Sequence, residues 1–166
     1  MTIPNKKRAL AIALLLPVAA ACALDHPPVK EGLWSIHRVT TTNPGNKKTD
    51  ATFTLCRNHA YDQHVEGLSK SVPGCPPPKE TLADGKFTTE MACKVGATTI
   101  VTKGTGWIHG DTSSHSESHA TYTPEFAGMS EMTMVQDETY VGSCPADMQP
   151  GDQKMADGHI LHLWKH

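Results

Sequence analysis

The feature that most constrains the fold is a long strand-forming stretch that is interrupted by a single turn signal. Residues 98–123 are rich in Thr, Val, Ile and Tyr, which favour extended structure. Gly110-Asp111 stands near the middle, where a two-residue hairpin turn is expected. The pattern predicts two long antiparallel strands, residues 98–109 and 112–123, that form the centre of a sheet.

Further strand patterns flank this hairpin, each bounded by turn residues. The predicted strands are 32–42, 51–56, 80–82, 86–95 and 131–140, with a last short strand at 159–166. The segment 145–158 between the last two is rich in turn residues. Because most strands follow one another after short connections, we predict an all-β fold: a curled antiparallel meander or a small barrel, which protects its edges.

One segment has the pattern of a helix. Asn58 is a good N-cap, and the residues after it repeat with the spacing of one helix face: Tyr61, His64, Val65 and Leu68. We predict one short helix that ends near residues 67–70. The proline-rich segment 72–79 that follows must be a loop, because proline lacks a backbone donor.

The first residues have the pattern of an export signal. A basic start at residues 6–8 is followed by an apolar run, 9–18, and by small residues, 19–23. The apolar run is too short to stay in a membrane as a spanning helix. We therefore predict an export signal at 1–21, a short extended tether at 22–31, and a single β-rich domain at 32–166.

Two cleavage sites compete in this signal. Cleavage after Ala21 would leave Cys22 first and acylated, as in a lipoprotein, whereas cleavage after Ala23 would use an ordinary A-x-A site. Removing Cys22 from the five cysteines leaves an even set, which suits an oxidising compartment. The cysteine count favours acylation of Cys22, and we expect a periplasmic protein anchored to the outer membrane.

The four remaining cysteines are expected to form structural disulfides. Cys75 and Cys93 flank a predicted hairpin, and a bridge there would close a loop of roughly 18 residues, contributing about 3 kcal/mol. Cys56 and Cys144 would then join an early strand to the segment after the last long one. We predict these two bridges, because the chain lacks the Cys-x-x-Cys spacing common at metal and catalytic thiols.

Charge and motifs narrow the function. The chain has 15 basic and 17 acidic residues, and loss of the three basic residues at 6–8 leaves 12 against 17, a net charge of −5. Without a basic patch, nucleic acid is not an expected partner. The sequence also lacks the nucleophile elbow, the zinc-protease motif and the phosphate-binding glycine loop. We therefore expect a non-enzymatic protein.

Several short motifs together resemble a known family. They are Gly32-Leu33-Trp34 soon after the export signal, Pro73-Gly74-Cys75, Tyr122-Thr123-Pro124, and the stretch 140–152, which contains Tyr-Val-Gly-Ser-Cys-Pro and Pro-Gly-Asp. The chain resembles a family of small exported bacterial proteins catalogued only as a domain of unknown function. The resemblance covers the whole mature chain. It implies a β-rich domain in the periplasm or at the outer membrane, and it brings no activity or catalytic residues.

Three side chains near the hairpin could bind a metal. On a strand, His115, Glu117 and His119 point the same way. Two imidazoles and a carboxylate suit Zn²⁺ or Cu²⁺. With Gly110-Asp111 as the turn, His115 would face Gly106 and Glu117 would face Gly104, leaving space over that face. The alternative is an ordinary solvated strand face.

The curled sheet itself offers another possible site. A concave sheet face can hold a small apolar ligand or a partner. Trp107, Met132 and Met134 are candidates to line it, since methionine adapts to irregular apolar ligands. We favour this binding function, with periplasmic metal binding as the alternative and an enzyme of unknown type third. Architecture alone does not establish function.

Overall fold

The computed structural model describes residues 28–164 and contains one helix and nine strands in that range. The elements are β1 (Gly32–Asn43), β2 (Lys47–Arg57), α1 (His59–Lys70), β3 (Lys79–Ala83), β4 (Lys86–Val95), β5 (Thr98–His109), β6 (Ser113–Phe126), β7 (Met129–Gly142), β8 (Asp152–Met155) and β9 (Ile160–His162). The predicted all-β class with one short helix is confirmed. The predicted export signal, Cys22 and most of the tether lie outside the described residues.

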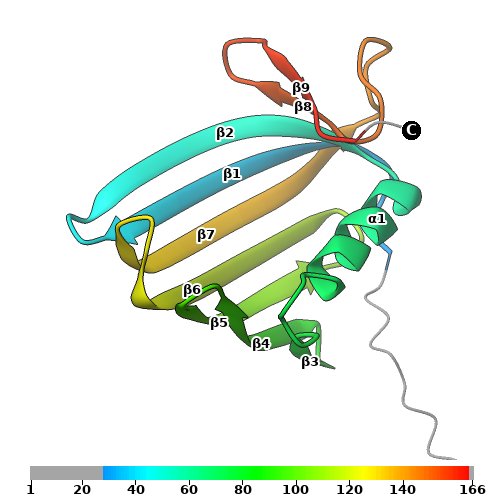
Figure 1. The fold of residues 1–166 in the computed structure, drawn as a ribbon. Helices are drawn as coiled ribbons and strands as arrows, with labels where there is room; N and C mark the ends of the chain where they lie inside the picture. Colours follow the sequence, from blue (N-terminus) through cyan, green and yellow to red (C-terminus); the bar gives the residue numbers. More distant parts are fainter. Residues whose placement is uncertain (1–27, 165–166) are drawn as a thin grey trace, which may run out of the picture.

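All nine strands form one antiparallel sheet in the order β3-β4-β5-β6-β7-β1-β2-β8-β9. Strands β3 to β7 form the predicted meander, but the β1–β2 hairpin is inserted between β7 and β8. The sheet is open, with β3 and β9 at its edges, so it is not the small barrel that we considered. It curls strongly, and α1 stands across its concave side (Figure 1).

The central hairpin differs from the prediction by one residue. His109 pairs with Ser113, so the connection has three residues, and Gly110 has a φ of 61°. Thr112 is not part of β6; its carbonyl oxygen accepts a hydrogen bond from the Tyr140 amide at 2.8 Å. The register therefore pairs His115 with Trp107, not with Gly106 as expected.

The tail contains a strand that the sequence pattern did not predict. Asp152–Met155 (β8), in the segment expected to be turns, pairs with Phe53–Leu55 of β2. Its other partner, β9, follows a few residues later, but β2 lies about a hundred residues earlier in the chain, and no local signal indicates that pairing. The predicted last strand is confirmed in part, as β9 covers residues 160–162.

The best-buried side chains lie on the concave side near β1 and β2. Trp34 is 0% exposed, and Ile36 packs with Phe53 and Leu55. The indole Nε1 of Trp34 donates a hydrogen bond to the Lys30 carbonyl oxygen at 2.8 Å. This cluster holds one end of the sheet together and leaves the region toward β4 and β5 less filled.

Both disulfides pair as the sequence predicts. Cys56 and Cys144 are joined, with their Cα atoms 5.5 Å apart, and Cys75 is joined to Cys93, with Cα atoms 4.6 Å apart. The first bridge ties the end of β2, next to α1, to the segment after β7. The second pins the loop after α1 to β4. The second bridge therefore tethers the C-terminal side of the helix to the sheet, while the first lies beside its N-terminal side.

Candidate binding pocket between the helix and the sheet

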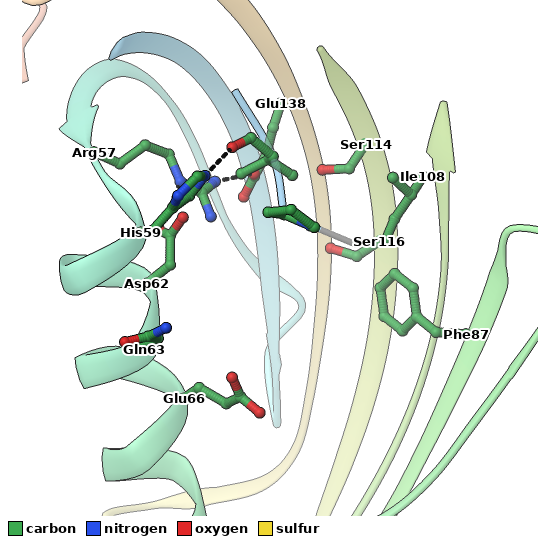
Figure 2. Close-up of a pocket in the computed structure, with 12 residues that line it drawn as sticks. Arg57, His59, Asp62, Gln63, Glu66, Phe87, Ile108, Ser114, Ser116 and Glu138 are labelled. Carbon is green, nitrogen blue, oxygen red and sulfur yellow. Dashed lines mark hydrogen bonds and ion pairs between the residues drawn. The ribbon is translucent and has the colours of Figure 1, made fainter. Parts of the chain in front are cut away.

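Helix α1 presents its polar side to the concave face of the sheet. The side chain of Asn58 caps the helix by accepting a hydrogen bond from the Tyr61 amide at 2.9 Å, as expected from the sequence. Four polar residues of one helix side face the sheet across a gap: His59, Asp62, Gln63 and Glu66 (Figure 2). The helix therefore does not close onto the sheet, and a cavity of about 500 Å³ lies between them.

The sheet side of this cavity is apolar at one end. Phe87 of β4 and Ile108 of β5 line it there, and Ser114 and Ser116 of β6 lie between them and Glu138 of β7. Gly106 makes room for the aromatic ring, since a β-carbon at residue 106 would stand 2.2 Å from Cζ of Phe87. Figure 2 shows Phe87 and Ile108 pointing toward the helix from the sheet.

The other end of the cavity is a hydrogen-bonded network of charged groups. The Arg57 guanidinium donates to Asp62 Oδ1 at 2.8 Å through Nε and to Glu138 Oε2 at 3.0 Å through Nη1 (Figure 2). Gln136 donates to the other oxygen of Glu138 at 2.5 Å, and Arg38 donates to Gln136 Oε1 at 2.6 Å. These bonds fix the side chains and give the cavity a rigid polar end.

The electrostatics of this network are unbalanced at Asp62. Burial raises the pKa of the Asp62 carboxyl, and the nearby Arg57 charge, which lowers that pKa, does not fully offset the effect. Arg57 is shared with Glu138, and the charge of Glu138 also raises the pKa of Asp62. At the polar end of the cavity, the Asp62 carboxyl is therefore partly removed from water and lies next to the charges of Arg57 and Glu138.

The start of the described chain closes the cavity near the helix N-terminus. Pro28 and Val29 line it. The Val29 carbonyl oxygen lies 3.1 Å from Nε2 of His59, and the Glu31 carboxylate accepts a hydrogen bond from the His59 amide at 3.0 Å. The segment before β1 is therefore bonded to the first turn of α1.

The three candidate metal ligands lie on the outer, convex face of the sheet. His115 places Nδ1 2.7 Å from Asp137 and Nε2 3.3 Å from Glu117, while Nε2 of His119 is 4.0 Å from Glu131. The hydrogen bond to Asp137, and then that to Glu117, raises the pKa of His115. Within residues 28–164 there is no group of three or more His, Cys, Asp or Glu arranged to hold a metal ion. Metal binding remains a prediction.

The three candidate ligand-lining residues lie on two different faces. Met132 and Met134 share the concave face with Gln136 and Glu138 but lie outside the cavity. Trp107 is on the convex face, where its ring centroid is 5.5 Å from that of His115. The expectation that Trp107 lines the same concave surface as the methionines is therefore corrected. The three-residue turn is the cause: with the predicted two-residue turn Trp107 would pair with Ser114, on the concave face, whereas the observed register pairs it with His115.

Sequence reasoning missed most of the residues that surround the cavity. Arg57, Asp62, Phe87, Ile108 and Glu138 have no local motif. The one available signal was the pair of strand glycines, which often marks close approach of another group. The sequence pattern identified the helix from its apolar residues, whereas the residues that line the cavity are on its polar side.

The helix in the described chain is short and polar, and no helix in residues 28–164 has the length and apolar character needed to cross a membrane. None of the curated proteins compared with this chain matches it. A family model described as Protein of unknown function (DUF3617) matches residues 29–144, which hold both disulfides and nearly all of the cavity lining. The match extends over more than half of the sequence, so the chain belongs to this family of proteins of unknown function.

Proposed function

We propose that this protein is an exported, non-enzymatic binding protein that holds a small, partly apolar molecule between α1 and the concave face of the sheet. The observation that carries the proposal is the cavity itself. Its volume of about 500 Å³ falls within the usual size of small-molecule sites, roughly 300–1,000 Å³. One end is apolar and the other carries fixed polar groups.

The two ends of the cavity assign the two parts of the ligand. An apolar group would lie against Phe87 and Ile108, where it removes apolar surface from water. A polar group would lie toward Ser114, Ser116 and Glu138, which offer hydroxyl and carboxylate oxygens. We therefore infer an amphipathic ligand, a more specific class than the apolar ligand expected from the sheet alone.

The arrangement of the charged residues supports binding as the role of the site. Arg57, Asp62 and Glu138 are engaged with one another through short hydrogen bonds. Side chains held in this way recognise a ligand at little entropic cost, because they are already ordered before it arrives. We propose that the protein does this outside the cytoplasm, anchored through an acylated Cys22.

The test is a titration with a neutral fluorescent apolar probe, N-phenyl-1-naphthylamine. Replacing Ser116 with Trp places a large ring inside the cavity, and we expect probe binding to weaken by about tenfold or more. Replacing Thr139, an exposed residue of β7, with Trp is the matched control and should leave binding unchanged. No binding by the unaltered protein, or equal binding by both variants, would sink the proposal.

The natural ligand is then sought in protein purified from the cell envelope without detergent exchange. Mass spectrometry of small molecules released on denaturation should detect an amphipathic compound in the unaltered protein. The same compound should be depleted in the Ser116→Trp variant and retained in Thr139→Trp. Folding of each variant is checked by circular dichroism and by the absence of free thiols.

A further inference from the structure

The side of α1 that faces away from the cavity is apolar and largely uncovered. Val65 is 44% exposed and Leu68 is 57% exposed, and Val72, just beyond the helix, is 41% exposed. Nearer the helix N-terminus the same side is covered, since Tyr61 and His64 pack against Trp164 with ring centroids 5.8 and 5.5 Å away. This side of the helix is therefore covered at Tyr61 and His64 and exposed to solvent from Val65 onward.

Tyr61, at the start of this side, packs against the core cluster of the sheet, but the later part of the helix reverses the usual orientation of an amphipathic helix, which turns its apolar side inward. The reversal is held in place by the polar network, because Asp62 on the inner side is bonded to Arg57 at the end of β2. The Cys75–Cys93 bridge also restrains the segment after the helix. Exposed apolar side chains that gather in one place mark a surface that contacts another body.

The position of the first described residues indicates what contacts this side of the helix. Val29 and Glu31 are bonded to His59 in the first turn of α1, and Figure 1 shows the blue start of the described chain beside the helix. Cys22, the predicted acylation site, lies only six residues before Pro28. Six residues span at most about 20 Å, so an acyl chain on Cys22 would hold α1 next to the bilayer.

We propose that the side of α1 formed by Val65 and Leu68, continued by Val72, lies on the phospholipid surface to which Cys22 anchors the protein. A short amphipathic helix can rest in the boundary between headgroups and acyl chains, and it strengthens a lipid anchor that is otherwise mobile. The cavity, on the opposite side of the same helix, then stands beside the membrane with α1 between them. This inference rests on the anchoring part of the proposed function.

Trp164 provides a reporter for the test, because its ring packs on α1 while Trp34 is buried. The acylated mature protein, with Trp107→Phe to remove the outer-face signal, is reconstituted into phosphatidylethanolamine–phosphatidylglycerol vesicles with brominated or unbrominated acyl chains. We expect bromine to quench Trp164. In a Val65→Ser/Leu68→Ser variant the quenching should fall by about half or more, because the apolar contact with lipid is lost.

The matched control is Val101→Ser/Val135→Ser, which removes two apolar side chains of similar exposure, 38% and 36%, from the outer face of the sheet. It should be quenched as strongly as the parent. Equal quenching of the Val65/Leu68 variant and the parent, or no quenching of either, overturns the proposal. A third outcome also overturns it: the Val65/Leu68 substitutions change the sedimentation of the protein but not the quenching. In that case a second copy of the protein covers these side chains.

The failures can be told apart. The mass of the amino-terminal peptide shows whether Cys22 is acylated, and an unacylated Cys22 overturns both the anchor and this inference. Acylation with no effect of the Val65/Leu68 substitutions overturns this inference alone. Ligand binding in the cavity is measured separately with the soluble probe, and its outcome does not depend on acylation of Cys22 or on lipid contact of α1.

Discussion

The ring of Phe87 on β4 lies over Gly106 on β5, so closely that a β-carbon at residue 106 would meet Cζ of the ring at 2.2 Å. The same β-carbon would lie 2.6 Å from the carbonyl oxygen of His115 on the other neighbouring strand. Only glycine fits between these groups. The close approach sets the position of the apolar wall of the cavity, and several consequences can be measured.

Gly106→Ala should destabilise the protein by about 1–3 kcal/mol, because the new methyl group forces the Phe87 ring or the strand to move. Gly67→Ala is the control, since a β-carbon there meets nothing within 4 Å, and alanine in a helix should stabilise by about 0.5–1 kcal/mol. Urea denaturation with intact disulfides measures both. Equal effects of the two substitutions would contradict the packing described here.

Asp152→Asn should destabilise the protein by about 1–3 kcal/mol, because an amide cannot accept both existing hydrogen bonds in the same way. The buried carboxylate accepts from the Gln149 amide at 2.8 Å and from His162 at 2.6 Å. Asp147→Asn, at an exposed residue 3.7 Å from Lys154, should change stability by less than about 0.5 kcal/mol. Chemical denaturation at neutral pH compares them.

The same carboxyl predicts a pH dependence. Burial would raise the pKa of Asp152, but the bonds from Gln149 and His162 outweigh it, and the pKa lies below its ordinary value. The folded state therefore favours the charged form. Its stabilisation is present above about pH 3.9, the unfolded value, and is lost as the pH falls through the lowered folded pKa. The acid limb of stability against pH should be shallower in Asp152→Asn.

His115 should titrate above its ordinary pKa because it bonds to Asp137 and Glu117. Its contribution to stability is therefore fully present below about pH 6.5 and is lost as the pH rises through the folded pKa. Nuclear magnetic resonance should show the pKa of His115 falling in Asp137→Asn. Glu131→Gln, which alters the neighbour of His119, should leave it unchanged; a shift in both variants would mean a general change of the outer face.

Cys22→Ser should release the protein from the membrane fraction, because the substitution removes the thiol that an acyl chain would modify. Fractionation of cell envelopes, with the protein followed by immunoblotting, measures the change. Cys22→Ala is not an independent control, since it also removes the thiol; Leu24→Ser, two residues later, is suitable. A parent protein that begins at Leu24 and is already soluble would contradict the lipoprotein interpretation.

Local patterns were enough to predict the elements that depend on neighbours in the chain. The alternation and β-branched content of residues 98–123 predicted two paired strands. Asn58 predicted the start of the helix, and its side chain accepts a hydrogen bond from the Tyr61 amide. Cysteine spacing led to the observed bridges, Cys56–Cys144 and Cys75–Cys93. The hairpin, the helix cap and the Cys75–Cys93 bridge depend on residues close in the chain, whereas Cys56–Cys144, 88 residues apart, followed as the pair that remained.

The cavity could not be predicted in this way, because its parts meet only in three dimensions. Arg57 at the end of β2 bonds Glu138, 81 residues later, and Phe87 reaches Gly106 on the adjacent strand. The helix pattern at Tyr61, Val65 and Leu68 correctly indicated a helix, and Tyr61 packs against the core cluster of β1 and β2, but Val65 and Leu68 stay exposed. Normal helix packing buries the apolar side, and here the bonds of Asp62 turn the polar side inward.

By itself the sequence therefore determined the all-β class, the single helix and the cross-links, since local backbone preference and residue type carry that information. Tertiary structure decided the insertion of the β1–β2 hairpin beside β7, the three-residue turn at Gly110, and the pairing of β8 with β2. Those outcomes depend on competition among distant strands for backbone hydrogen bonds and buried surface. Such competition is settled only when the whole sheet forms.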